Sequence, residues 1–254
     1  HHQLFHFEES FKILEYGDHS VILPSNGEYS FCMFFFSGFN ENASKYIYLF
    51  KQFFEFMTIK LPIKVVIPLL PLYKGYGRYL KDPSKFKDIY SWYEFKYEDD
   101  KVTIGENKEY DEFIKELIIK EIKHLESSER IIFAGFSQGG KYLLDMLIKL
   151  KIKTLFNVIF KSAIVRGLEN PYKTEDSDEA RRFNENVFYL YYSIHERVVT
   201  YDNVVKYLLA MKKNFKYINV KNDNGHKHLV DYSCLAYLDI IVRKYLYQYR
   251  ITKF

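Results

Sequence analysis

The sequence predicts a single α/β domain built on a mostly parallel central sheet, with helices on both faces of the sheet. Short apolar runs of strand length alternate along the chain with segments whose apolar residues recur at helical spacing. The chain has 254 residues, which is long enough for one large core. No internal repeat, low-complexity tract or linker divides the sequence, so residues 1–254 are expected to form one domain.

The first third of the chain predicts strands around one helix. The strands are expected at Phe11–Tyr16, Ser20–Leu23, Ser30–Phe36 and Ile63–Pro68. The turn signal Gly17-Asp18 joins the first two strands, so residues 1–29 are interpreted as an N-terminal β-hairpin extension. The helix is expected at Glu41–Met57, where the apolar residues share one face.

The pattern weakens between Tyr73 and Asn107, where glycines, a proline and an acidic cluster interrupt it. We interpret residues 73–107 as a lid-like loop region, because long loops in compact domains usually have a function or cover a site. Beyond it, helices are expected at Tyr110–Leu125, Gly139–Lys151, Tyr201–Asn214 and Asp231–Tyr247. Strands are expected at Glu129–Ala134, Thr154–Ser162, Asn186–Ser193 and Phe215–Val220, with a polar connection at Arg166–Asn184. This alternation predicts parallel βαβ units.

Composition excludes several classes of protein. The 37 Lys+Arg and 33 Asp+Glu residues are interspersed and give a net charge of +4, so no basic tract predicts a nucleic-acid partner. The longest apolar runs have strand length, which is too short for a transmembrane segment. Cys32 and Cys234 cannot make a disulfide framework and are expected to be buried thiols in a reducing compartment. The 24 Tyr, 23 Phe and one Trp form an aromatic excess that sequence alone explains only in part.

The most specific motif is Gly135-Phe136-Ser137-Gln138-Gly139, a G-x-S-x-G sequence between an expected strand and an expected helix. Such a turn is so tight that the serine takes strained backbone angles, and side chains two residues before and after it would collide. The serine Oγ then stands at the N-terminus of a helix, whose dipole favours developing negative charge. Ser137 is therefore the candidate nucleophile.

A serine hydroxyl is a weak nucleophile until a base accepts its proton, and with this turn the acid and then the histidine follow the serine along the chain. His226 and His228 lie in a loop after the last expected strand, and we expect His228 to be the base. The expected acid is Glu196, in the loop after the preceding strand. Asp202 is the competing candidate, although it is expected to begin and cap the next helix. For His195 we expect a structural or surface role.

Acyl transfer also needs two preorganised N–H donors for the oxyanion of the transition state. One is expected to be the backbone amide of Gln138, directly after the nucleophile. The other is expected from the loop Ser37-Gly38-Phe39-Asn40, which follows the first buried strand, and we choose the Phe39 amide.

Several segments together resemble one known family. Arg130–Gly140 resembles the nucleophile segment of the acyl-protein thioesterase / phospholipase-carboxylesterase family, in which G-F-S-Q-G-G is characteristic. Further matches follow the family order at Val65–Pro68 with Pro71, Ser91–Glu94, Glu196–Thr200 and Gly225–His228. The last match places the family histidine at His228 rather than at His226. The resemblance extends from about residue 30 to residue 248.

The resemblance implies an α/β-hydrolase fold and a serine esterase or thioesterase. It implies a triad of Ser137, His228 and Glu196, with no metal ion and no organic cofactor. The implied substrates are acylated proteins, lysophospholipids or small carboxylic esters. The loop over the acyl site is expected to present Leu72, Tyr73 and Trp92 to the substrate.

Three positions depart from the family pattern. Ser37 stands where the family has His, Glu196 where it has Asp, and Lys141 where it has a small residue. These departures support an alternative hypothesis, in which a catalytically impaired hydrolase-fold protein serves as an accessory or structural subunit of a larger assembly. Peripheral membrane contact is a further alternative. The expected location is cytoplasmic, with a processed mitochondrial form as the alternative.

Overall fold

The computed structural model describes residues 11–56, 62–80 and 87–253. Its strands are β1 (Phe11–Glu15), β2 (His19–Pro24), β3 (Phe31–Phe36), β4 (Ile63–Pro68), β5 (Leu72–Tyr73), β6 (Ile89–Tyr90), β7 (Tyr93–Glu98), β8 (Lys101–Glu106), β9 (Ile131–Phe136), β10 (Phe156–Phe160), β11 (Val187–Ser193) and β12 (Tyr217–Asp223). Its α-helices are α1 (Lys45–Phe56), α2 (Lys108–Leu125), α3 (Gln138–Leu150), α4 (Asp178–Asn184), α5 (Tyr201–Asn214) and α6 (Tyr232–Lys253).

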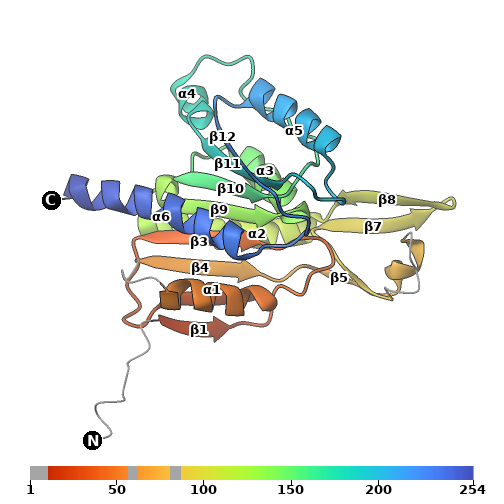
Figure 1. Ribbon diagram of the computed structural model, residues 1–254, viewed down its shortest axis with the longest axis horizontal. Coiled ribbons are helices and arrows are strands. Elements are labelled where there is room, and N and C mark those ends of the chain that lie inside the picture. The colour runs from red at the N-terminus through yellow and green to blue at the C-terminus, as the bar shows by residue number, and fades with distance from the viewer. Residues whose placement is uncertain (1–10, 57–61, 81–86, 254) are drawn as a thin grey trace, which may run out of the picture.

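The centre of the domain is an eight-stranded sheet with the order β1-β2-β4-β3-β9-β10-β11-β12 (Figure 1). Neighbouring strands from β4 to β12 in this order pair in parallel. β2 runs antiparallel to both β1 and β4, so the predicted N-terminal hairpin extends the main sheet. Residues 1–10 of the predicted extension and the end of the first predicted helix at Met57 lie outside the described residues.

Helices cover both faces of this sheet, as the sequence predicts. In Figure 1, α1 and α6 lie over the near face, while α2 and α3 lie behind the strands. Every residue of β3 and β9 is buried, which explains why both strands are continuous apolar runs without alternation. Both cysteines are buried free thiols, as expected. In the described part of the chain, none of the helices combines the length and the apolar character needed to cross a membrane.

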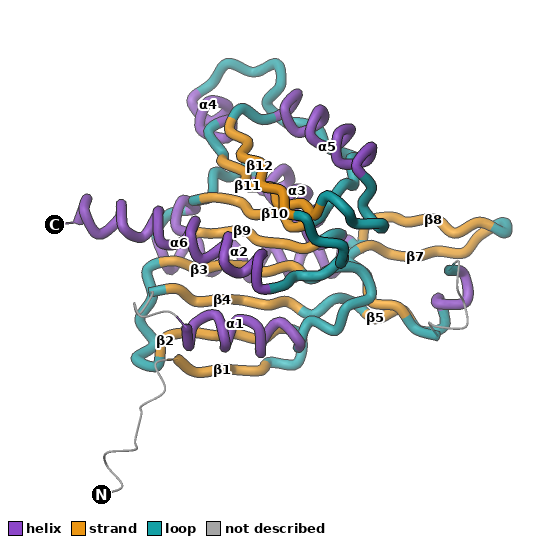
Figure 2. The backbone as a smooth tube through the Cα atoms, viewed as in Figure 1, coloured by secondary structure: helices purple, strands orange, loops and turns teal. Residues whose placement is uncertain are grey.

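The 73–107 region holds more regular structure than its interpretation as a loop region implies. β5 pairs with β6, and β7 pairs with β8 in an antiparallel hairpin that projects beyond the carboxyl ends of the parallel strands (Figures 1 and 2). The acidic cluster in this region is the hairpin turn, where Asp99 and Asp100 have φ angles of 51° and 59°. Two consecutive residues with positive φ match the turn type that two-residue hairpins favour, and Asp tolerates this conformation.

The predicted polar connection at Arg166–Asn184 ends in a short helix that the sequence pattern did not indicate, because its last 7 residues form α4. Ser177 is the N-cap of this helix, and its Oγ accepts a hydrogen bond from the Ala180 amide at 3.1 Å. Asp178 and Glu179 follow in the first turn, where negative charge complements the helix dipole. The helix is short and mostly polar, with Phe183 among the few residues it buries, so hydrophobic periodicity did not reveal it.

One close approach fixes how the sheet meets its central helix. The first turn of α3 lies directly against the end of β3, with Gly139 at the point of contact. A Cβ atom added to Gly139 would lie 2.0 Å from the carbonyl oxygen of Phe36 and 2.4 Å from that of Ser37. Both obstacles are backbone atoms of the sheet and of the loop that follows it, so they cannot rotate away. Only glycine fits between the helix and this strand end.

Substituting Gly139 with alanine should therefore be strongly destabilising. We expect Gly139→Ala to lower the free energy of unfolding by about 3 kcal/mol, because the methyl group forces backbone to move in a packed core. Gly105→Ala is the control, since a Cβ atom at this exposed hairpin position meets nothing within 4 Å. Denaturant unfolding should place the control within about 0.5 kcal/mol of the wild type. Equal stabilities for the two variants would contradict the close approach.

Candidate active site

Ser137 lies in the tight turn between β9 and α3, at the carboxyl edge of the sheet. Its φ and ψ angles are 52° and −116°, a conformation that costs a residue with a side chain about 1–3 kcal/mol. The Ser137 amide donates a hydrogen bond of 2.9 Å to the carbonyl oxygen of Phe160 at the end of β10. The turn is also so tight that position 135 admits only glycine, because a Cβ atom on Gly135 would lie 2.6 Å from the carbonyl oxygen of Gly139.

His228 lies in the loop between β12 and α6, and its imidazole reaches the serine. The distance between His228 Nε2 and Ser137 Oγ is 3.0 Å, which is a hydrogen-bond distance. The ring packs on the side chain of Phe136 with the centroids 4.7 Å apart. A serine and a histidine that are 91 residues apart in sequence are thus brought into direct contact.

Glu196 lies in the loop after β11 and approaches the opposite side of the same imidazole. One of its carboxylate oxygens, Oε1, is in ion-pair contact with His228 Nδ1. In the described residues this Nδ1 makes no hydrogen bond of regular geometry, so the two groups meet as a close charge contact. Glu196 is only 6% exposed, and its Oε1 also accepts a hydrogen bond of 3.2 Å from the Val199 amide. The extra methylene of Glu, compared with Asp, still lets the carboxylate reach the histidine.

The other candidates from the sequence lie elsewhere. Asp202 is an exposed residue in the first turn of α5, and it forms no ion pair or hydrogen bond in the part of the chain that the structure describes. The expectation that Asp202 caps this helix was wrong, since Thr200 occupies the N-cap position. His195 and His226 stack on each other with ring centroids 5.1 Å apart, and His226 lies in the same loop as His228.

Gln138 is the first residue of α3, so its backbone amide has no partner within the helix. Its side chain is buried and holds the loop before β7. The Gln138 Oε1 accepts a hydrogen bond of 3.0 Å from the Trp92 amide, and its Nε2 donates to Ser91 Oγ at 3.2 Å. The first turn of the nucleophile helix is thereby tied to the 73–107 region.

Phe39 lies in the loop after β3, and hydrogen bonds hold the residues immediately before and after it. The Gly38 amide donates to Glu41 Oε1 at 2.6 Å, and the Asn40 amide donates to the carbonyl oxygen of Tyr90 at 2.7 Å. Asn40 has a φ of 56°, so the chain turns sharply immediately after Phe39. The Phe39 ring packs on Phe95 of the hairpin at a centroid distance of 5.7 Å.

The three residues expected to face the substrate differ widely in burial. Trp92 is fully buried, and its indole Nε1 donates a hydrogen bond of 2.7 Å to the carbonyl oxygen of Ser37. Its ring stacks on Tyr142 of α3 at 4.5 Å, which places it in the core beneath the loop after β3. Leu72 is 42% exposed. Tyr73 is half-buried, and its hydroxyl accepts a hydrogen bond of 2.9 Å from Asn107.

Lys141 is buried on α3, where a small residue was expected from the family pattern. Its Nζ forms an ion pair with Asp145 one turn later, and it lies 5.9 Å from the centroid of the Tyr93 ring. The Tyr93 hydroxyl donates to the other Asp145 oxygen at 2.5 Å. Burial and the neighbouring Asp145 raise the pKa of the Tyr93 hydroxyl well above its usual value. The buried cation is therefore neutralised within the protein.

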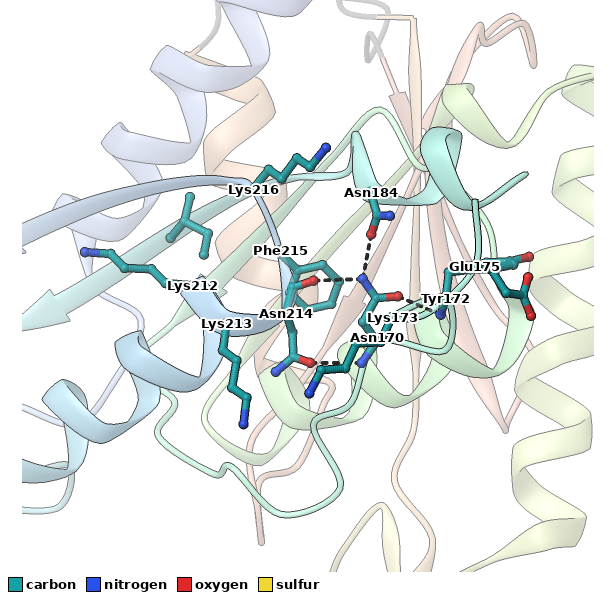
Figure 3. Close-up of a pocket in the computed structure, with 11 residues that line it drawn as sticks. Asn170, Tyr172, Lys173, Glu175, Asn184, Lys212, Lys213, Asn214, Phe215 and Lys216 are labelled. Carbon is teal, nitrogen blue, oxygen red and sulfur yellow. Dashed lines mark hydrogen bonds between the residues drawn. The ribbon is translucent and has the colours of Figure 1, made fainter. Parts of the chain in front are cut away.

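A hollow of about 570 Å³ lies near the amino ends of β11 and β12, at the opposite edge of the sheet from Ser137. Figure 3 shows the side chains that line it. Asn170 lies at its centre and hydrogen-bonds to Asn184 and Asn214. Its lining also includes lysines at positions 173, 212, 213 and 216. No Ser, Cys or His lines it, so among the described residues it offers no nucleophile with a base. Groups of three or more His, Cys, Asp or Glu that could hold a metal ion do not occur in the described ranges either.

The chain is similar to known proteins in sequence family and in fold. The family model described as phospholipase/carboxylesterase matches residues 80–232, which is more than half of the chain. Among solved structures, acyl-protein thioesterase 2 of Zea mays superposes with a TM-score of 0.66 at 16% identity, over 91% of this chain and 100% of that one.

Two further structures share the fold. SOBER1 of Arabidopsis thaliana superposes with a TM-score of 0.64 at 14% identity, over 85% of this chain and 99% of that one. Esterase PE8 gives a TM-score of 0.59 at 15% identity, over 92% of this chain and 98% of that one. No curated protein sequence matches the chain significantly.

Asp223 anchors the start of the loop that carries His228. Its carboxylate accepts hydrogen bonds from the Tyr191 hydroxyl and, at 2.8 Å, from the Gly225 amide. Burial acts to raise the pKa of Asp223, but these hydrogen bonds and the charge of Lys161 outweigh burial and hold the pKa below its usual value of 3.8. The ionised carboxylate is therefore the form that the folded loop stabilises.

The Asp223 carboxylate should make stability dependent on acid pH. A pKa lowered by folding contributes stability that is present above the unfolded-state pKa, about 3.9, and is lost as pH falls through the folded-state value. We expect Asp223→Asn to be less stable than the wild type at pH 7, with a difference that shrinks as pH falls below about 4. Urea unfolding across this range measures the difference. Tyr191→Phe should also be less stable than the wild type at pH 7, by a smaller amount. A stability difference for Asp223→Asn that does not change with pH would contradict the lowered pKa of Asp223.

Proposed function

Because this chain belongs to the phospholipase/carboxylesterase family, we propose that it hydrolyses carboxylic esters or thioesters through a triad of Ser137, His228 and Glu196. The observation that carries the proposal is the 3.0 Å distance between Ser137 Oγ and His228 Nε2. The left-handed backbone of Ser137 supports it further, because strain of this kind is retained where it serves a function.

The first half of the reaction forms an acyl-enzyme. Ser137 Oγ attacks the carbonyl carbon of the substrate while His228 Nε2 accepts the hydroxyl proton. The imidazolium that results carries its positive charge beside the Glu196 carboxylate, which is nearly excluded from water and therefore interacts strongly with it. His228 then gives its proton to the departing alcohol or thiol, and the acyl group remains on Ser137.

The negative oxygen of the tetrahedral intermediate is stabilised by backbone amides. Gln138 offers an N–H at the start of α3, where the helix dipole adds to the field. The Phe39 amide is the second donor in this proposal. The hydrogen bonds that hold Gly38 and Asn40 on either side of Phe39 support it, since a preorganised donor costs no rearrangement during the reaction.

The second half of the reaction hydrolyses the acyl-enzyme. His228 accepts a proton from water as the water oxygen attacks the acyl carbon, and it then returns that proton to Ser137 Oγ. Each proton moves between the serine, the imidazole and the substrate or water, so the cycle needs no cofactor. The carboxylic acid product leaves and the enzyme is restored.

The proposed substrates are acylated proteins, lysophospholipids or small carboxylic esters. One of the structural neighbours is an acyl-protein thioesterase and another an esterase, which supports ester or thioester carbonyls as the reacting group. We place the enzyme in the cytoplasm, supported by two buried cysteines that remain free thiols. The accessory-subunit alternative receives less support, because Lys141 is neutralised by Asp145 and Glu196 contacts His228.

The proposal predicts an activated serine at position 137. A fluorophosphonate probe should label the wild-type protein covalently, because its phosphorus is attacked by a serine whose proton a base accepts. Ser137→Ala should abolish labelling, as gel fluorescence with matched protein amounts would show. Labelling that persists in Ser137→Ala would move the nucleophile elsewhere. An unlabelled wild type would sink the enzyme proposal and favour the accessory-subunit alternative.

The proposal also distinguishes the two candidate acids. Glu196→Gln should lower kcat for p-nitrophenyl acetate by about 10³-fold. The imidazolium of His228 would lose its negatively charged partner, and the neutral imidazole would no longer be held in the required tautomer and orientation. Asp202→Asn is the matched control and should retain kcat within about twofold, since it removes one exposed carboxylate. Steady-state kinetics on both variants decides the assignment. The reverse ranking would transfer the acid role to Asp202.

A further inference from the structure

Lys161 is a completely buried lysine at the carboxyl end of β10, and the catalytic proposal does not use it. Its side chain is 0% exposed. Its backbone has a φ of 54°, the left-handed region that lysine rarely enters. Burial of an ammonium group and a strained backbone are both unfavourable, so the contacts of this side chain must compensate for them.

The contacts of Lys161 Nζ lie on both sides of His228. It donates a hydrogen bond of 2.9 Å to the carbonyl oxygen of Lys227 and one of 2.8 Å to the carbonyl oxygen of Leu229. A carboxylate oxygen of Asp231, the residue before α6, lies 4.0 Å away. Nζ therefore holds the carbonyl groups of the two residues that flank the histidine, and the three donors of one ammonium suit this arrangement.

The loop itself offers these carbonyl groups little other support. It connects β12 to α6 and forms neither helix nor strand. Asp223 holds the beginning of the loop through Gly225, and Asp231 begins the next helix by accepting a hydrogen bond from the Cys234 amide. Between these two anchors, Lys161 supplies the contacts to the backbone that flanks His228.

The end of β10 also touches the other two segments that carry proposed triad residues. The carbonyl oxygen of Phe160 accepts the hydrogen bond from the Ser137 amide. The Lys161 amide donates at 2.8 Å to the carbonyl oxygen of Tyr191, in the strand that leads to Glu196. Two consecutive residues, 160 and 161, thus connect the serine turn, the end of β11 and the histidine loop.

We infer that Lys161 is a positioning residue, whose buried Nζ fixes the backbone around His228 so that Nε2 meets Ser137 Oγ. This inference rests on the proposed function, because it assigns Lys161 a part in the same reaction. Lys161 contacts neither Ser137 Oγ nor His228 Nε2 directly, so its effect is on the geometry of the base. A displacement of about 1 Å at a reacting pair costs about 10²-fold in rate.

The test is Lys161→Met, which keeps most of the side-chain volume and removes the donors. We expect kcat for p-nitrophenyl acetate to fall by about 10–100-fold while KM stays within about twofold, because the base is misplaced and the substrate site is unchanged. Lys64→Met is the matched control. Lys64 is a largely buried lysine of β4 that forms an ion pair with Glu121 of α2. Its substitution should therefore lower stability and leave kcat unchanged.

Hydrogen–deuterium exchange supplies a readout that does not depend on activity. Peptides covering residues 224–231 should exchange faster in Lys161→Met than in the wild type, and at the wild-type rate in Lys64→Met. Should Lys161→Met fail to fold, Lys161→Gly accepts the positive φ without strain and also lacks the donors. The same loss of kcat and of protection is expected for it.

The outcomes separate this inference from the proposed function. A wild type that fluorophosphonate leaves unlabelled overturns both. A labelled wild type together with a Lys161→Met or Lys161→Gly variant that keeps kcat within about twofold overturns the positioning role alone. Unchanged exchange of residues 224–231 in these variants also overturns it, because the loop would then be held without Lys161.

Discussion

The contact on which the site depends is the approach of the first turn of α3 to the end of β3. Gly139 lies so close to the carbonyl oxygens of Phe36 and Ser37 that no side chain fits between them. This approach forces the chain to turn sharply between β9 and α3, which gives Ser137 its left-handed backbone and places its hydroxyl within reach of His228. It also brings the loop after β3 beside the N-terminus of α3. The proposed nucleophile and both proposed oxyanion donors therefore follow from one backbone contact.

Two of the three departures from the family pattern, Lys141 and Glu196, have partners nearby, whereas the buried Ser37 hydroxyl has no hydrogen-bond partner among the described residues. At Ser37 the backbone matters, since its carbonyl oxygen accepts the hydrogen bond from the Trp92 indole while its own side chain is fully buried. Lys141 brings a buried cation to the nucleophile helix, and Asp145 neutralises it. Glu196 reaches the imidazole in spite of its greater length. Each replacement is accommodated without disturbing the contact between Ser137 and His228.

The sequence predicts the structure best where steric constraints allow only one residue type or one kind of residue. The glycines around Ser137 identify the turn, since a tight strand-to-helix turn admits no other residue type there. The apolar runs at β3 and β9 identify buried strands, since every residue in them is enclosed. The order of Ser137, Glu196 and His228 along the chain follows from the order of parallel strands in the sheet.

Other features depend on tertiary contacts that no local pattern records. The hairpin is an exception, because residues 93–98 strictly alternate aromatic and charged side chains, which is the period of a strand, and only its turn is atypical, with Asp99 and Asp100 in place of glycine. Trp92 lies in a segment expected over the acyl site, yet its ring is buried because the indole has a carbonyl partner in Ser37. In the sequence, Lys161 is an ordinary charged residue near the end of the strand expected at Thr154–Ser162. Only the fold shows that its Nζ is enclosed between two carbonyl groups.

If Ser137 is the nucleophile, it carries the acyl group of the substrate during turnover. Rapid quenching of the protein with a p-nitrophenyl ester in excess, followed by peptide mass spectrometry, tests it directly. We expect one acyl group per chain on the peptide that contains Ser137, formed and lost at rates consistent with steady-state turnover. Hydrolysis that proceeds without an acylated Ser137, or with the acyl group on another residue, would contradict it.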